Sequence, residues 1–142
     1  MKSKANKILG LLVLLIGVTV SAQSLKVMTY NIRLDIASDG LNDWSHRKDF
    51  WIAQMQFYDP DVFGVQEATP NQVTDLTQAF ANYVKVGIGR ELEGKGEASC
   101  VFFKKDRFDL LQSNTFWLSE TPNQVSMGWD AACNRVCRSE ER

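Results

Sequence analysis

Two apolar, strand-like segments that each end in a polar residue constrain the fold more than any other feature of the chain. The first, LKVMTYN, ends at Asn31, and the second, DVFGVQE, ends at Glu67. Between them, residues 46–58 carry apolar side chains at helical spacing, which predicts a strand–helix–strand unit. Because ligands gather at the carboxyl ends of strands in open sheets, we expect Asn31 and Glu67 to converge at one edge.

An amide and a carboxylate at one edge suit a hard divalent cation such as Mg²⁺ or Mn²⁺, which prefers oxygen ligands. Glu67 is the stronger candidate, with Asn31 as a ligand or a contact to a phosphate oxygen. Simpler interpretations stay open: Glu67 as a solvated carboxylate, and Asn31 as a turn former. His46 is the single histidine, so a histidine general base would have to be this residue, although its position favours a solvated surface role.

The order of elements predicts an α/β (α+β) fold with a mixed sheet whose helices lie on one face. Ser45 is the expected N-cap of the first helix. Thr69, Pro70 and Gln72 form a capping-box start for a second helix that reaches about Ala81. The remaining expected strands are 83–88, 99–103 and 108–116, the last two paired through a turn at 104–107. Beyond Trp117 the sequence shows turn signals and no clear element.

The N-terminus has the pattern of a secretory signal peptide, residues 1–22. A basic stretch precedes an apolar run over residues 8–20, and small residues lead to an expected cut after Ala22. A membrane anchor is the alternative, but the run is shorter than the ~20 residues a span needs. Cleavage predicts a secreted or periplasmic protein with no remaining membrane span.

The cleaved chain, residues 23–142, is long enough for one small domain. Loss of three of the 16 basic side chains leaves 13 against 17 acidic ones, a formal charge of −4. This charge gives no support for a stable nucleic-acid complex, where a basic face is expected. A bound cation would still permit a phosphodiester substrate. Among the three cysteines, Cys100 is expected to be buried, whereas Cys133 and Cys137 are either paired or free.

Several motifs resemble the endonuclease/exonuclease/phosphatase family, in particular its secreted bacterial members. The most specific are MTYNIR at 28–33 and PDVFGVQEA at 60–68. Further matching segments are NDW at 42–44 with RK at 47–48, GEAS at 96–99, VFF at 101–103, FWLSETP at 116–122 and GWDA at 128–131. The resemblance covers about residues 25–136.

The resemblance implies a four-layered αββα sandwich and Mg²⁺-dependent hydrolysis of phosphate mono- or diesters, in nucleic acid or in small molecules. Asn31 matches the family's N-terminal active-site asparagine, and Glu67 matches its metal-binding glutamate. Arg33 stands where some relatives carry a second acidic ligand, which leaves open whether one metal or two would bind. In the tail, Asp130 and Arg135 are candidates for contact with an anionic substrate, although a surface role is the simpler interpretation.

The family's later motifs, of the Asn-Thr-His, Gly-Asp-x-Asn and Ser-Asp-His types, are not found in this sequence. The pattern also breaks from about residue 137. We therefore expect the N-terminal half of the sandwich, truncated or frameshifted, inactive alone and poorly stable. The alternative function is a secreted, non-catalytic binding module that uses loops 35–44 and 117–130 for contact with a glycan or a protein.

Overall fold

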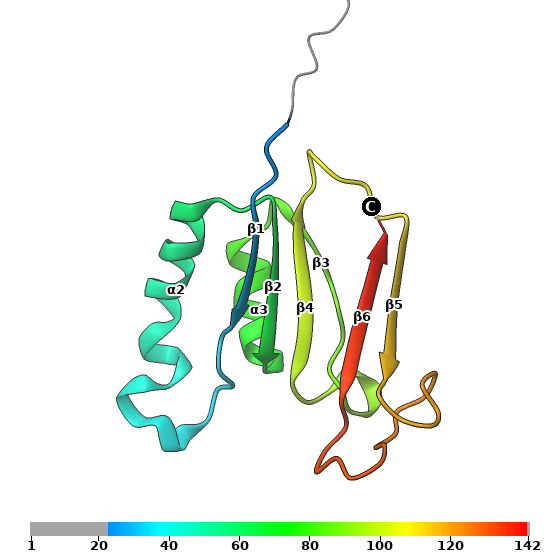
Figure 1. Cartoon of the computed structure of the whole chain (residues 1–142). Helices are drawn as coiled ribbons and strands as arrows, with labels where there is room; N and C mark the ends of the chain where they lie inside the picture. Colours follow the sequence, from blue (N-terminus) through cyan, green and yellow to red (C-terminus); the bar gives the residue numbers. More distant parts are fainter. Residues whose placement is uncertain (1–22, 142) are drawn as a thin grey trace, which may run out of the picture.

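The computed structural model describes residues 23–141 of the chain and shows a layer of helices against a mixed sheet (Figure 1). The predicted signal peptide lies outside these residues. The elements in chain order are β1 (Val27–Asn31), the 3₁₀ helix η1 (Ala37–Asn42), α2 (Trp44–Tyr58), β2 (Val62–Ala68), α3 (Pro70–Ala79), β3 (Tyr83–Val86), the 3₁₀ helix η2 (Leu92–Gly94), β4 (Ala98–Lys104), β5 (Gln112–Trp117) and β6 (Val136–Glu141). Within the described range, no helix combines the length and hydropathy that crossing a bilayer requires.

The main sheet has the strand order β1-β2-β4-β3. Strands β1 and β2 are parallel, with Val27 opposite Val62 and Asn31 opposite Gln66. Strand β4 runs antiparallel to β2 and to β3. The predicted mixed sheet is therefore confirmed, and the parallel pair brings the carboxyl ends of β1 and β2 to the same edge.

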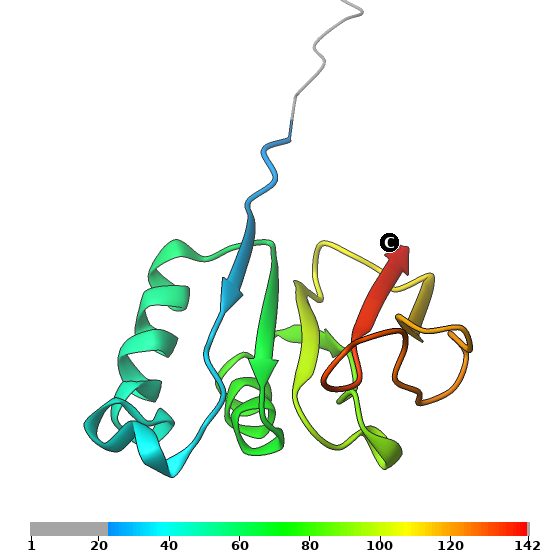
Figure 2. The same ribbon diagram turned by 60° about the horizontal axis from the view of Figure 1, so that its bottom comes forward.

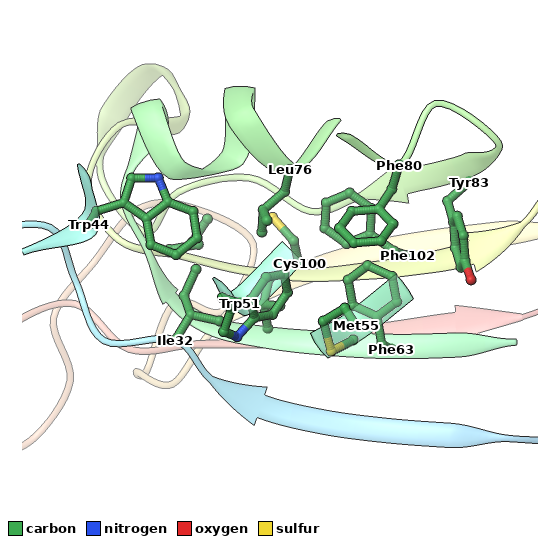
Figure 3. Packing of buried hydrophobic residues seen from close by; sticks show 13 residues of the cluster. Ile32, Trp44, Trp51, Met55, Phe63, Leu76, Phe80, Tyr83, Cys100 and Phe102 are labelled. Carbon is green, nitrogen blue, oxygen red and sulfur yellow. The ribbon is translucent and has the colours of Figure 1, made fainter. Parts of the chain in front are cut away.

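One face of the sheet is covered by α2 and α3, as expected. Large apolar side chains fill the space between the two helices and the sheet (Figure 3). Phe63 of β2 stacks on Phe102 of β4 at a centroid distance of 4.7 Å, and Phe80 meets Phe63 edge-on at 5.2 Å. Cys100 is buried in the same cluster, which confirms the predicted location of that thiol. This aromatic packing fixes β2 between its neighbours.

The opposite face of the sheet has a much smaller core. Val62, Val86 and Phe103 are buried there, and Phe108 packs on Phe103. At the edge of the sheet, Val27 remains exposed. Both views place the β5–β6 hairpin beside β4, on the side away from the helices (Figures 1 and 2). The hairpin is thus a partial second layer, which the sequence had not predicted.

Two predictions about the C-terminal third are wrong. Residues 108–116 do not form a hairpin with β4, because β5 pairs with β6 in a separate two-stranded sheet. The stretch beyond Trp117, where no element was expected, contains strand β6. Its polar sequence hides the strand, but a backbone ladder needs no apolar side chains, and Arg138 adds a bond to Ser113 Oγ at 2.8 Å.

The two helices differ in how well their starts were predicted. Helix α2 begins at Trp44 with Asp43 as its N-cap, not Ser45. The Asp43 carboxylate also accepts from the Ser45 hydroxyl and contacts His46, and these bonds lower its pKa to about 2. The capping-box start of α3 is confirmed: the Thr69 N–H donates to Gln72 Oε1 at 2.9 Å.

Candidate functional site

A small polar pocket of about 210 Å³ opens at the carboxyl ends of β1 and β2. Strands β1 and β2, the loop that leads into β4 and the segment that leads into β6 meet around it. Its lining consists of Asn31, Gln66, Glu67, Arg90, Glu97, Ala98, Ser99, Asn134, Arg135 and Val136. Both residues that the sequence predicted to converge are among them.

Asn31 and Glu67 are in direct contact in this pocket. Asn31 Nδ2 donates to Glu67 Oε1 at 2.8 Å. The orientation of the amide is set by the next turn of backbone, because the Arg33 N–H donates to Asn31 Oδ1 at 2.9 Å. The amide oxygen therefore accepts one hydrogen bond within the chain, and Asn31 presents its N–H group to the carboxylate.

The backbone at Glu67 is unusual. Its φ is +60°, in the left-handed region that disfavours residues with a side chain. The register between β2 and β4 also shifts between Val65 and Ala68. Bulges of this kind re-aim side chains and are frequent beside active sites, and strained backbone at such a place points to a functional constraint.

The loop after β1 is held from two helices. Gln72 of α3, fully buried, donates from Nε2 to the Arg33 carbonyl at 2.9 Å. Arg47 of α2 donates from Nη2 to the same carbonyl at 3.0 Å and also bonds the Ile32 carbonyl. These contacts fix the segment that orients Asn31. Sequence reasoning found the capping box of α3 but neither the N-cap of α2 nor this supporting role.

Arg33 itself turns away from the pocket. Its φ is also +60°, and its guanidinium pairs with Asp39 of η1, with Nη2 2.6 Å from Oδ1. This hydrogen bond raises the pKa of Arg33 and lowers the pKa of Asp39. Arg33, at the position where some relatives carry a second acidic ligand, thus forms an ion pair with Asp39 and does not line the pocket.

The far wall of the pocket comes from the loop between β3 and β4. Arg90 holds Glu97 through two bonds, Nη1 to Oε2 at 3.0 Å and Nη2 to Oε1 at 2.9 Å. Trp117 Nε1 donates to the Arg90 carbonyl at 2.8 Å, and Asn134 Nδ2 donates to Glu91 Oε2 at 2.7 Å. The sequence showed residues 89–96 only as a charged, glycine-rich loop and Glu97 only as part of the family-like segment 96–99, so neither Arg90 nor Glu97 was predicted to line the site.

Of the other predicted site residues, one lines the pocket and two lie outside it. Arg135 lines the pocket, and it forms no ion pair among the described residues. Asp130 is exposed in the β5–β6 loop, outside the lining. His46 is exposed at the start of α2 and bonded to Asp43 at 2.9 Å. Within residues 23–141, no three His, Cys, Asp or Glu side chains form a group able to hold a metal.

The comparisons with known proteins identify the family. The model of the endonuclease/exonuclease/phosphatase family matches residues 28–125, which include Asn31 and Glu67. The chain belongs to the endonuclease/exonuclease/phosphatase family. The family resemblance inferred from the motifs is therefore confirmed, whereas the comparison does not test the secreted type.

Solved structures give the same answer and add detail. A family member from Bacteroides vulgatus is 41% identical, with a TM-score of 0.77 over 81% of this chain and 45% of that one. A mannosyl-6-phosphatase from Bacteroides thetaiotaomicron is 39% identical, with a TM-score of 0.77 over 81% and 44%. The present chain thus spans less than half the length of these relatives and has the corresponding part of their fold.

A more distant similarity concerns the fold alone. D. rerio TDP2, solved with a single-stranded DNA product, is 21% identical, with a TM-score of 0.55 over 69% of this chain and 37% of that one. The comparison with curated proteins gave no match.

Proposed function

We propose that this chain carries the metal- and phosphate-binding half of a Mg²⁺- or Mn²⁺-dependent phosphoesterase site. The observation that carries the proposal is the 2.8 Å contact between Asn31 and Glu67 at the carboxyl ends of β1 and β2, in a pocket that Arg135 also lines. Family membership supports hydrolysis of phosphate esters, as in the related mannosyl-6-phosphatase.

The residues present fit a magnesium ion of the substrate-bridging kind. Such ions are held by one or two carboxylates and keep waters or substrate phosphate oxygens as their other ligands. Glu67 supplies one carboxylate, and the pocket has room for water and phosphate. Asn31 Oδ1 already accepts the Arg33 N–H, so its second lone pair is the one left for a metal ion. The role of Asn31 is to orient Glu67 and to donate to a phosphate oxygen.

In the proposed reaction, a water oxygen attacks phosphorus, the ester P–O bond breaks, and the leaving oxygen takes up a proton. A bound cation offsets the charge that builds on the phosphoryl oxygens. Arg135 adds a guanidinium, which suits phosphate geometry. Glu67 holds its position through the Asn31 amide. Asp130 would contact the substrate only from the rim.

We further propose that the chain alone does not turn over substrate. The match covers 45% and 44% of the two Bacteroides relatives described above. Among the described residues, the pocket around Glu67 is lined by no histidine that could act as a base. Export to the periplasm or the cell exterior also belongs to the proposal, on the signal-like pattern of residues 1–22; a mature N-terminus at Gln23 would support it.

Calorimetric titration with Mn²⁺ tests the site. The wild-type chain is expected to bind one Mn²⁺ and Glu67→Gln to bind none, while neither hydrolyses a chromogenic phosphomonoester. Equal Mn²⁺ affinity in the two proteins would overturn the site. Turnover by the wild type that Glu67→Gln abolishes would support the site and overturn the expected inactivity.

A further inference from the structure

We infer that the wall formed by Arg90 and Glu97 recognises the hydroxyl groups of the leaving group, so that the site takes phosphate monoesters of sugars or other polyols. This inference rests on the proposed function and adds a substrate class and two specificity residues to it. Glu97 lies in the family-like segment 96–99, but the sequence analysis gave no role to it or to Arg90.

The composition of the pocket is the first support. Its lining is polar except for Ala98 and Val136, and none of the described residues that line it is aromatic. A nucleobase is ordinarily bound by stacking on an aromatic ring, and this part of the site provides none. The volume of about 210 Å³ is also below the roughly 300–1,000 Å³ of pockets for drug-sized ligands. A compact, hydroxyl-rich ligand matches both properties.

The chemistry of the Arg90–Glu97 pair is the second support. A hydroxyl both donates and accepts, a carboxylate accepts at up to four lone-pair sites, and a guanidinium has five N–H donors. The two bonds between Arg90 and Glu97 use only part of this capacity. One sugar hydroxyl can therefore donate to Glu97 and accept from Arg90 while the pair stays intact. The side chains are 19% and 24% exposed, which leaves them reachable from the pocket.

The rigidity of this wall is the third support. Trp117 anchors the Arg90 carbonyl, and the loop is closed so tightly that a β-carbon at Gly89 would lie 2.0 Å from the Lys95 carbonyl oxygen. A fixed pair of polar groups can select a ligand because it does not rearrange to suit another one. The wall also faces Asn31 and Glu67 across the same pocket, where the phosphate end of the ester is proposed to sit.

Competition binding to the purified chain in Mn²⁺ tests the inference, with glucose 6-phosphate, inorganic phosphate and adenosine 5′-monophosphate as probes. We expect glucose 6-phosphate to bind about tenfold more tightly than either of the others, the scale of one hydrogen bond to a charged group. Glu97→Gln should remove most of this preference and leave phosphate affinity unchanged. Glu93→Gln, in the same loop but outside this pocket, is the matched control and should behave as wild type.

The outcomes separate the two proposals. Phosphate binding without a preference for glucose 6-phosphate, or with a preference for the nucleotide, overturns the inference and leaves the proposed function standing. Binding of none of the three probes overturns both. Because the preference is measured on the wild-type chain, a Glu97 variant that fails to fold does not rescue the inference; Arg90→Lys, which keeps the charge but loses the paired bonds, then serves as the second variant.

Discussion

Strand β2 is flanked by two carboxylates whose surroundings are opposite. Asp61, just before the strand, is 4% exposed and accepts from the Lys26 N–H at 2.9 Å, with Arg107 Nη1 at 2.5 Å and Lys104 Nζ at 3.3 Å. Glu67, near its end, has the Asn31 amide as its hydrogen-bond partner at 2.8 Å. One carboxylate is surrounded by donors, and the other is held by a neutral group in an open pocket.

The difference shows how a single strand divides stability and function between its two ends. A carboxylate already matched by cations has little to offer a ligand, whereas one oriented by an amide keeps its charge available. Positive φ does not separate the two ends, because it occurs at Glu67 and Arg33 and also at Asp59, the C-cap of α2 just before Asp61. The hydrogen-bond partners of the two carboxylates do separate them, so we assign the Asp61 end to folding and the Glu67 end to binding.

The largest expected effect concerns the middle of the strand, between the two carboxylates. Phe63→Ala removes the ring that stacks on Phe102 and should lower the free energy of unfolding by about 3–5 kcal/mol, as for other buried phenylalanines. Chemical denaturation measures it. Phe57→Ala, at a site that is 82% exposed, is the control and should change stability little. Equal losses in both variants would mean that the helix-covered core does not hold β2.

The next effect separates the two ends directly. Glu67→Gln should weaken Mn²⁺ binding by at least ~10–100-fold. Removing a residue that only orients a metal ligand already lowers metal affinity by that factor, and Glu67 is proposed as the ligand itself. Asp61→Asn should leave Mn²⁺ affinity unchanged and lower the melting temperature instead. Calorimetry and thermal melts on both proteins give the comparison. Loss of Mn²⁺ affinity in Asp61→Asn, with unchanged affinity in Glu67→Gln, would contradict the assignment of binding to the Glu67 end and folding to the Asp61 end.

A smaller effect tests the strain at the binding end. Glu67→Gly should raise the free energy of unfolding by up to ~1 kcal/mol, because glycine adopts a positive φ without the cost that other residues incur, while Mn²⁺ binding is lost. Glu93→Gly is the control: its φ is +58°, so it should gain similar stability and keep the metal. A loss of stability in Glu67→Gly alone would show that the contact with Asn31 outweighs the strain.

The last effect is confined to acid conditions and is a dependence of stability on pH. The Lys26 N–H and then Arg107 lower the pKa of Asp61 from 3.8 to about 2. A carboxylate with a lowered pKa stabilises the fold fully above the unfolded value, so this contribution should disappear as the pH falls from about 4 through 2. Melting temperatures measured across this range should fall less steeply for Asp61→Asn than for wild type. If melting temperature falls equally with pH in Asp61→Asn and wild type, Asp61 does not cause the acid dependence.

The sequence predicts the first half of the fold well because its signals are local or depend on one strand pairing. Thr69 and Gln72 specify a helix start by themselves, and Asn31 and Glu67 converge once β1 and β2 are parallel. The C-terminal third could not be predicted in this way. The partner of β5 is a polar segment about 20 residues later, and Arg90 reaches Glu97 only after a tight loop that no residue spacing reveals.

The most direct measurement is a crystal structure of the chain soaked with Mn²⁺, analysed by anomalous scattering. The account predicts one anomalous peak at bonding distance from the Glu67 carboxylate, roughly 2.0–2.2 Å as for comparable small divalent ions, with the Asn31 amide nitrogen still facing that carboxylate. A peak beside Asp61 with none at Glu67, or no peak at either end of β2, would contradict it.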